Sequence, residues 1–347
     1  MLKVLGTHMK IAIIGCGGIS RAHSRDIKKL IDAGEDLEVK YLVDIVKEKA
    51  LKLKVEFGFD SAEVREDYKE VIPYVDAAVI CTPHTLHFRQ ALDFVSAGKH
   101  VLVEKPMTHR VKEAYQLVKE AEKQGVVLEI AYQRHFIPKY IVARDFVLSG
   151  GLGDVKFISL TLAQGWYKIA KGTWRGTRSL GGGGELIDSG SHISDIAFWT
   201  TGLKPVEVFA YIDCYDIEVD VNTCLSAKLT KGALLSFTVA GDDPSWLETE
   251  IFWGDRGRLV IFDKGVVFTS RDRKTITLDT SNVKGSRPIF NFIDAINGKD
   301  KNKSPAIYGL YVAALSEAAY KSIERMRPIS VKELCKEQGI DYSYFLD

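Results

Sequence analysis

The sequence lacks several features that would assign it to a specialised class of proteins. It has no excess of charge, because 47 Lys and Arg residues balance 46 Asp and Glu residues in a chain of 347. No run of like charge resembles a tail that binds nucleic acid or a membrane surface. No apolar stretch approaches the roughly 18 residues that span a bilayer, and the start has no cleavage site of a signal peptide. We therefore expect neither nucleic acid nor a membrane as a partner.

Cysteine is scarce, and its spacing carries no motif. The five cysteines form no C-x-x-C pair, and no ligand spacing in the chain matches a zinc site. We therefore expect reduced thiols, no bound metal and a cytoplasmic protein. The acidic run at 213–220 is expected to be a solvated strand connection rather than a cation site. We also expect Met9 to be the natural start, with residues 1–8 as an added leader.

The first third of the sequence alternates short apolar segments with amphipathic ones. Amphipathic segments at 19–33 and 46–57 predict helices. Continuous apolar runs rich in β-branched residues, separated by such helices, indicate a parallel sheet covered on both faces. The predicted strands are 10–15, 38–44, 76–82, 100–105 and 126–132.

The pattern changes at about residue 155 to successive strands joined by turns, with few helices between them. This pattern indicates an antiparallel sheet. Two later helices are predicted at 288–297 and 306–325. The sequence therefore predicts an α/β domain followed by an α+β domain with a boundary near residue 133, and its length suits two domains.

A glycine-rich turn follows the first predicted strand. The stretch G-C-G-G-I-S places Gly15, Gly17 and Ser20 in the frame of a dinucleotide-binding fingerprint, where glycines let a pyrophosphate approach a helix N-terminus. Alone, this pattern also fits an ordinary strand–helix turn. Asp44, 24 residues after Ser20 at the end of the second strand, is placed to bind the ribose hydroxyls. Because Ile45 rather than an arginine or serine follows it, we expect NAD, with NADP as the alternative.

A lysine stands at another strand end. Pro106 keeps Lys105 out of helical geometry, so its amine is presented at the carboxyl edge of the sheet, where doubly wound folds bind ligands. The alternative is a surface lysine before a turn, and the pattern does not separate the two.

A carboxylate and an imidazole follow four consecutive glycines at 181–184. Asp188 and His192 fit positions i and i+4 of one helix, which would bring both side chains to one face. The glycines would let the backbone pass close to a planar ligand. The alternative is a flexible loop followed by a buried Asp–His pair that serves packing.

Taken together, these motifs resemble the glucose–fructose oxidoreductase/inositol dehydrogenase family, also called Gfo/Idh/MocA. The similarity covers nearly the whole chain, and E-K-P together with D-x-x-x-H is its most diagnostic part. The motifs that carry it are the glycine turn with His23 downstream, T-P-H-T-L-H at 82–87, E-K-P at 104–106, R-H-F-I-P at 134–138, W-R at 174–175 and G-G-G-x-x-x-D-x-x-x-H at 182–192.

The resemblance implies two domains with separate tasks. Residues 1–133 would form an NAD(P)-binding Rossmann domain. Residues 134–347 would form a domain for substrate binding and oligomerisation, with a large, mostly antiparallel open sheet, and the helix at 306–325 would pack back on the first domain. Such sheets often mediate dimers or tetramers, so we expect a homodimer or homotetramer. Bulky side chains on the sheet would be Phe237, Trp246, Phe252 and Trp253.

The resemblance also implies roles for individual residues. Lys105, Asp188 and His192 would surround the reacting carbinol. His135 departs from a family pattern in which many relatives carry a second arginine, which leaves the substrate pocket open. Substrate contacts would come from Arg134, Trp174 and Arg175. Cofactor contacts would come from Gly15, Gly17, Gly18, Ile19, Asp44, Thr82, Pro83, His87, Glu104 and Lys105.

The implied reaction is hydride transfer between nicotinamide and a sugar, a cyclitol or a sugar-derived alcohol. Hydride loss from carbon requires loss of the hydroxyl proton. A neutral His192 would accept that proton, with Asp188 fixing its tautomer, and Lys105 would donate a hydrogen bond to the developing alkoxide. Which of His192 and Lys105 is the formal base stays open, as does the substrate. The alternatives are an NAD-dependent glycosidase of the same family and a non-catalytic nucleotide-binding sensor.

Overall fold

The computed structural model describes residues 8–346 and divides into two compact units. The first unit runs to Met107 and adds Gln116–Ala131 and Ser286–Ala306. The second consists of Thr108–Tyr115, Tyr132–Gly285 and the chain from Ile307 onward. The chain thus leaves the first unit after Met107 and again after Ala131, and it returns at Gln116 and at Ser286. The leader expected at 1–8 lies outside the described residues except for His8.

The first unit is built on a six-stranded parallel sheet, as the alternating pattern predicted. Its strand order is β3-β2-β1-β4-β5-β6, with β1 in the middle and the connection between β3 and β4 crossing the sheet. β1 and β4 are almost entirely buried because helices cover both faces, and this explains their uninterrupted apolar sequences. The strands are β1 (Met9–Ile14), β2 (Leu37–Val43), β3 (Glu63–Arg65), β4 (Ala77–Ile80), β5 (His100–Val103) and β6 (Leu128–Ile130).

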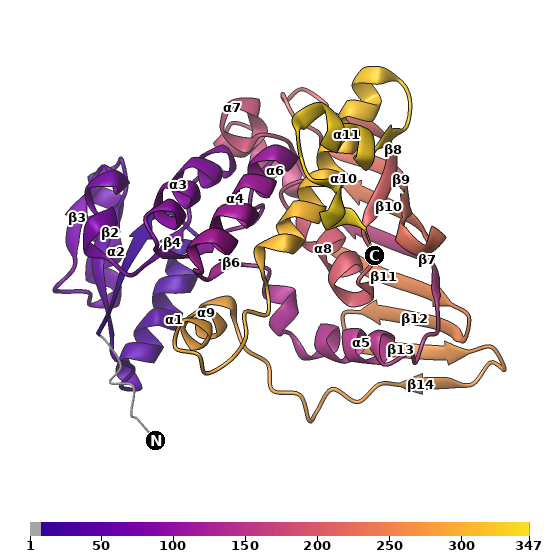
Figure 1. Cartoon of the computed structure of the whole chain (residues 1–347), viewed down its shortest axis with the longest axis horizontal. Coiled ribbons are helices and arrows are strands. Elements are labelled where there is room, and N and C mark those ends of the chain that lie inside the picture. The colour runs from indigo at the N-terminus through magenta and orange to yellow at the C-terminus, as the bar shows by residue number, and fades with distance from the viewer. Residues whose placement is uncertain (1–7, 347) are drawn as a thin grey trace. The chain divides into compact units, whose positions relative to one another are not determined.

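One face of this sheet is covered by helices from distant parts of the chain. Helix α9 packs beside α1, and Figure 1 shows the two together. Phe292 and Ile293 of α9 join Ile27 of α1 and Leu102 of β5 in one buried apolar cluster. Pro288 opens α9, a position where its missing N–H costs nothing. The helices that accompany this sheet are α1 (Ser20–Asp32), α2 (Lys47–Phe57), α3 (His84–Ser96), α4 (Val111–Gln124) and α9 (Pro288–Ile296).

The second unit is built on a nine-stranded sheet that is mostly antiparallel, which confirms the predicted fold class. Its order is β14-β13-β12-β11-β7-β10-β9-β8-β15, and the central pair β7 and β10 runs parallel. The strands are β7 (Val155–Ala163), β8 (Pro205–Asp213), β9 (Asn222–Leu229), β10 (Leu234–Ala240), β11 (Leu247–Gly254), β12 (Gly257–Phe262), β13 (Gly265–Ser270), β14 (Thr275–Thr277) and β15 (Ile329–Ser330).

The two faces of the nine-stranded sheet differ in what covers them. Helices α5 (Pro138–Leu148) and α8 (Gly190–Thr201) pack on one face (Figure 1). Phe237 and Phe252 are fully buried there, so these two bulky side chains of the sheet do not contribute to an exposed surface for oligomerisation. Neighbouring residues of a strand point to opposite faces, and Trp253 accordingly lies on the open face, with its ring 5.2 Å from that of Phe157.

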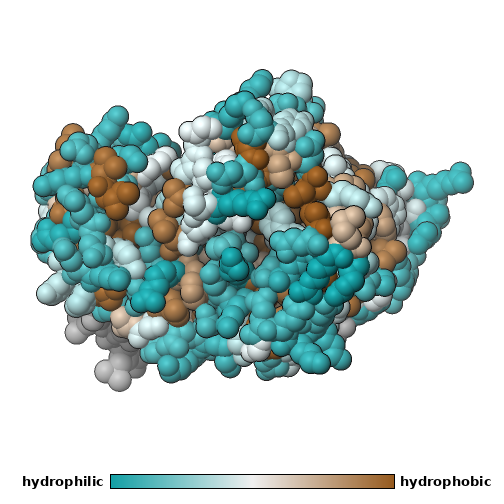
Figure 2. All heavy atoms as spheres, turned by 90° about the horizontal axis from the view of Figure 1, so that it is seen from above, coloured by the Kyte–Doolittle hydropathy of each residue, from teal (hydrophilic) through white to brown (hydrophobic). Residues whose placement is uncertain are grey.

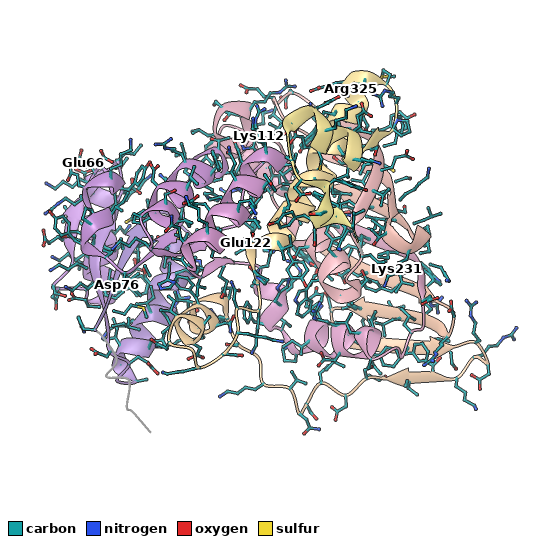
Figure 3. All side chains as sticks on the ribbon, in the orientation of Figure 1. Glu66, Asp76, Lys112, Glu122, Lys231 and Arg325 are labelled. Carbon is teal, nitrogen blue, oxygen red and sulfur yellow. The ribbon has the colours of Figure 1, made fainter. Side chains whose placement is uncertain are left out.

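Two late helices complete the second unit. Helix α10 (Ala306–Arg325) ends in Arg325, which is labelled in Figure 3. Its guanidinium forms ion pairs with Glu333 and Glu337 of α11 (Val331–Gln338) at 2.7 Å each, which ties α11 to the end of α10. Hydrophilic side chains make up most of the face shown in Figure 2, with apolar ones in small groups. Among residues 8–346 no helix has both the length and the apolar character needed to cross a membrane.

Candidate active site

The glycine turn between β1 and α1 has the form of a pyrophosphate cradle. Gly15 has φ of +88°, and a Cβ there would lie 2.8 Å from the backbone of Cys81, so no other residue fits. A Cβ at Gly17 or Gly18 would meet no described atom within 4 Å, which leaves room for a ligand above the turn. Ser20 opens α1 and donates a hydrogen bond from its hydroxyl to the carbonyl of Gly17 at 2.7 Å. The N-terminus of α1 therefore points toward open space suited to an anion.

Asp44 lies beside this turn, as the spacing predicted for a ribose-binding carboxylate. Its Oδ2 accepts from the backbone N–H of Cys16 and its Oδ1 from that of Val46, both at 2.8 Å. These bonds hold both oxygens in place while each keeps capacity for a further donor. Burial and the Asp44 carboxylate raise the pKa of the Cys16 thiol to about 12, so Cys16 is not a nucleophile at neutral pH.

His87 joins the two loops that follow β4 and β5. Its side chain is fully buried, with one ring nitrogen 2.8 Å from the carbonyl oxygen of Thr82 and the other 2.8 Å from that of Pro106. Burial lowers the pKa of His87 even though both carbonyls favour the charged form. The imidazole is therefore neutral at pH 7 and donates to one carbonyl at a time. Pro83 precedes α3, and this places the predicted residues Thr82, Pro83 and His87 in one cluster of the first unit.

Glu104 and Lys105 follow β5 in the same unit. The imidazole Nε2 of His23 lies 2.7 Å from Oε1 of Glu104 in a buried pair. Burial opposes ionisation of Glu104, but the bond from His23 and the charges of His23 and Lys105 outweigh it and lower its pKa. The Lys105–Pro106 peptide bond is cis, and the Lys105 backbone N–H donates to Glu104. Glu104 is thus an ionised carboxylate next to the predicted catalytic lysine.

The carboxylate and imidazole of the second unit do not share a helix. Helix α8 begins at Gly190, so His192 lies in its first turn while Asp188 lies in the turn before it. The Gly190 N–H reaches back to the carbonyl of Glu185 at 2.8 Å, a wider loop than one helical turn. The prediction that Asp188 and His192 occupy positions i and i+4 of one helix is therefore wrong, because Asp188 precedes the helix that contains His192.

Asp188 is held by residues from the segment after β7. Its Oδ2 accepts from the indole N–H of Trp166 at 2.9 Å and from Nε of Arg175 at 3.1 Å. The Arg175 guanidinium in turn lies 4.4 Å from the ring centroid of Trp174. The structure thus brings the predicted residues Trp174, Arg175 and Asp188 together. Trp166 was missed, and the only signal was that a buried indole N–H needs an acceptor.

His192 has aromatic neighbours that the sequence did not indicate. The Tyr132 ring lies 6.1 Å from that of His192, edge to face, and 5.9 Å from the ring of His135. His135 stacks on Trp199 at 4.3 Å and its Nε2 lies 2.7 Å from the carboxylate of Asp195. Burial raises the pKa of Asp195 although His135 works against it. His135, where the sequence departs from the family pattern, therefore forms a buried pair with Asp195 of α8.

The glycines at 181–184 approach protein atoms. A Cβ at Gly184 would lie 1.9 Å from the carbonyl oxygen of Asp220, and one at Gly183 would lie 2.5 Å from the hydroxyl of Tyr320. The backbone contact requires glycine at position 184, whereas a Cβ at position 183 would displace the Tyr320 side chain. The interpretation that the glycines serve a nearby planar ligand is not needed for Gly183 and Gly184.

Asp220 anchors the same segment through its side chain. Its Oδ1 accepts from the Gly184 N–H at 2.8 Å and from the Tyr320 hydroxyl at 2.7 Å, and its Oδ2 accepts from the Leu186 N–H at 2.9 Å. The Thr223 hydroxyl donates to Oδ2 as well, at 3.2 Å. Asp220 is only 1% exposed, so the expectation of a solvated connection at 213–220 is wrong for this residue. Its carboxylate replaces the solvent that these backbone N–H groups would otherwise need.

Arg134, a predicted substrate residue, belongs to a buried charged group under α5. Its Nε and Nη2 donate to the two carboxylate oxygens of Glu248 at 2.9 and 2.6 Å. The Tyr140 hydroxyl also donates to Glu248 and lies 3.2 Å from Glu250. Burial opposes the charge of Glu248, but Arg134 outweighs it and lowers its pKa. Burial and the charge of Glu248 raise the pKa of Glu250 to about 8, so Glu250 is protonated at pH 7.

Both units match family models that cover most of the chain. Residues 9–132 match a model described as an oxidoreductase family with an NAD-binding Rossmann fold. Residues 140–260 match the GFO/IDH/MocA C-terminal domain. These matches confirm the resemblance found in the motifs.

Similar proteins match nearly the full length of the chain. The myo-inositol 2-dehydrogenase of Thermotoga maritima is 25% identical, with 94% of this chain and 99% of its own length covered. The D-glucoside 3-dehydrogenase of Escherichia coli is 25% identical over 91% of this chain and 95% of its own. The solved structure of a levoglucosan dehydrogenase with NADH and levoglucosan superposes with a TM-score of 0.82 at 20% identity, covering 94% of this chain and all of the other. At that identity the structural match shows the fold.

Replacing Glu250 by glutamine should change how stability depends on pH. The folded wild type keeps the Glu250 proton up to about pH 8, whereas the unfolded chain loses it near the ordinary value of 4.5. The wild type therefore loses stability as pH rises between these values. Glutamine mimics the protonated acid and does not titrate, so the advantage of Glu250→Gln should grow by at most about 1.4 kcal/mol per pH unit. Urea unfolding at pH 5, 7 and 9 measures it.

The matched control is Glu66→Gln, which removes an exposed carboxyl of the first unit. The difference in the free energy of unfolding between Glu66→Gln and the wild type should stay the same at all three pH values. A Glu250→Gln variant that parallels this control would show that Glu250 ionises normally.

Proposed function

Because the chain belongs to the Gfo/Idh/MocA family of oxidoreductases, we propose that it transfers a hydride between nicotinamide and a CH–OH group of a sugar, cyclitol or sugar-derived alcohol. The observation that carries the proposal is the position of His192 in the first turn of α8, four residues after the ion-paired Asp188. The relatives named myo-inositol 2-dehydrogenase and D-glucoside 3-dehydrogenase support this substrate class.

The residues of the first unit fit a dinucleotide. The open space above Gly17 and Gly18 suits the pyrophosphate, and Asp44 offers fixed carboxylate oxygens to the adenosine ribose. Ile19, next to the turn, is 44% exposed and offers an apolar contact. Thr82, Pro83, His87 and Glu104 would line the remainder of the cofactor site. When bound, NAD supplies the hydride acceptor.

Lys105 and His192 would handle the hydroxyl proton. His192, as a neutral imidazole, accepts the proton of the substrate hydroxyl, and Lys105, as an ammonium, donates a hydrogen bond to the oxygen as negative charge develops there. The Asp188 carboxylate, held by Trp166 and Arg175, stabilises the imidazolium through its negative charge. Trp174 and Arg175, which adjoin Asp188, would contact the other hydroxyls of the substrate.

Removing either proton-handling side chain should abolish most turnover without unfolding the protein. His192→Ala and Lys105→Ala should each lose roughly 10²- to 10⁴-fold in kcat, because a positioned acid–base group contributes about that much. The kcat of the double variant should fall by far less than the product of the two single-variant factors, since both groups act on one hydroxyl. NADH absorbance with a panel of neutral sugars and cyclitols measures the rate.

The control variant is Lys112→Ala, which removes an exposed lysine of α4. It should match the wild type in turnover and melting temperature. A His192→Ala protein with a lower melting temperature but full turnover per folded molecule would assign the residue to packing. Substrate consumption without NADH formation would instead indicate a glycosidase that recycles its cofactor.

Cofactor choice should depend on Asp44. Its carboxylate would accept hydrogen bonds from the ribose hydroxyls of NAD and repel the 2′-phosphate of NADP. NAD should therefore bind more tightly than NADP. Asp44→Ser should reduce this difference in affinity, whereas Asp60→Ser at an exposed position should leave it unchanged. Titration calorimetry with both dinucleotides measures the ratio. Equal or tighter binding of NADP by the wild type would contradict the assignment.

We also propose that the open face of the nine-stranded sheet forms an interface between copies of the chain. Tyr211, Leu234 and Leu247 are about half exposed or more on or beside this face. Exposed apolar side chains gathered on one face favour an interaction site. The wild type should sediment as a dimer or tetramer at micromolar concentration. Leu234→Lys should shift it toward the monomer, whereas Leu51→Lys on exposed α2 should not. A monomeric wild type would refute the interface.

A further inference from the structure

The ring of Tyr132 contacts two imidazole rings, those of His192 and His135. The Tyr132 side chain is fully buried. Its ring centroid lies 6.1 Å from that of His192, with the two planes at 68°, and 5.9 Å from that of His135. An edge-to-face contact at this separation is a favoured geometry for two aromatic rings. Because the contact depends on the direction of both planes, it restrains the plane of the His192 imidazole.

The second imidazole, that of His135, is held by partners of its own. Its Nε2 lies 2.7 Å from Oδ2 of Asp195, and both side chains are fully buried. Its ring stacks on Trp199 at 4.3 Å with an angle of 11° between the planes. The Arg144 guanidinium lies 4.7 Å from the centroid of the same Trp199 ring. Side chains packed in this way keep one rotamer, so Tyr132 rests against a fixed surface.

Helix α8 carries several members of this group on one face. His192, Asp195 and Trp199 are separated by three and four positions along the helix, a spacing that brings side chains to the same side. Tyr132 directly precedes a short 3-10 helix, η3 (Gln133–Phe136), and η3 packs against α8. The packing of η3 on α8 therefore brings the Tyr132 ring to the first turn of α8, where His192 lies.

The ring of Tyr132, rather than its hydroxyl, makes these contacts. The hydroxyl is buried and has no hydrogen-bond partner among residues 8–346. Burial and the charge of Asp195 raise the pKa of the phenol well above its ordinary value, so it stays protonated at neutral pH. Phenylalanine at this position would keep the ring contacts and remove only a polar group that has no partner.

An imidazole that accepts a proton has to direct one particular nitrogen at the donor. The χ2 torsion of histidine has a broad profile, so the torsion alone does not fix the ring and packing has to do so. We propose that Tyr132 is a positioning residue, whose ring restricts rotation of the His192 imidazole and so keeps its proton-accepting nitrogen directed at the substrate hydroxyl. The inference rests on the proposed function and adds a residue that acts through His192.

The kinetic test replaces the ring by an aliphatic side chain. Tyr132→Leu should lose roughly tenfold in kcat per folded molecule, because a small misplacement of a catalytic group is enough to slow the reaction by such a factor. The KM for the sugar and the affinity for NAD should stay close to the wild-type values. Tyr132→Phe should keep the wild-type kcat, because it keeps the ring. NADH absorbance with the neutral sugars and cyclitols measures turnover below the melting transition.

The matched control is Phe198→Leu, which shortens another fully buried aromatic side chain of α8. The Phe198 ring contacts that of Tyr311 at 6.1 Å. Both leucine variants should melt at a lower temperature, because each leaves space in the core. Only Tyr132→Leu should lose kcat.

Three kinetic results would contradict the proposal. They are wild-type kcat in folded Tyr132→Leu, an equal loss of kcat in Phe198→Leu, and a loss of kcat in Tyr132→Phe. If Tyr132→Leu shows no cooperative melting, Tyr132→Met takes its place with the same expected outcome, because methionine fills irregular space in a core.

The orientation of His192 is also measured without turnover. Crystal structures of the full chain should show one orientation of the imidazole in the wild type and in Tyr132→Phe, and a rotated or second orientation in Tyr132→Leu. An unchanged imidazole in Tyr132→Leu would overturn the proposal. A wild type that oxidises no sugar or cyclitol would refute the proposed function, while these structures would still test Tyr132, so the two failures are distinguishable.

Discussion

The second unit depends on one buried carboxylate, that of Asp220. It binds the backbone of Gly184 and Leu186 and the hydroxyl of Tyr320, and so fixes the segment that leads into α8. Because Asp188 and His192 follow directly, their positions derive from this anchor. A carboxylate that accepts several hydrogen bonds in the interior is stable, whereas the same backbone groups left unpaired would each carry a desolvation penalty.

The interior around α5 and α8 contains buried charged side chains, and two pairs of them are in direct contact. Arg134 meets Glu248, and His135 meets Asp195, each in a nearly or fully buried contact. Pairs of this sort add little net stability, because desolvation of both charges offsets their attraction. Their value lies in fixing the direction of hydrogen-bond donors, and Arg134 retains one such donor.

In the first unit, the glycine turn and the carboxylate beside it can be recognised in the sequence alone. Gly15 is required by a positive φ and by contact with Cys81, while Gly17 and Gly18 leave space for a ligand. The Asp44 carboxylate accepts a hydrogen bond from the backbone of this turn. All these features are local to the ends of β1 and β2, and so they appear in the sequence as a short motif at a fixed distance from a carboxylate.

The sequence by itself determined the parallel and antiparallel sheets and the glycine turn with Asp44 beside it, because strand alternation and strand-end motifs are local. Tertiary structure alone decided the rest. Trp166 reaches Asp188 across 22 positions, Asp220 reaches Gly184 across 36, and Arg134 reaches Glu248 across 114. The late segment at 288–296 joined the first sheet only because its apolar face packs there. Partners of buried polar groups are chosen by proximity in the folded chain, and spacing along the sequence holds no record of that proximity.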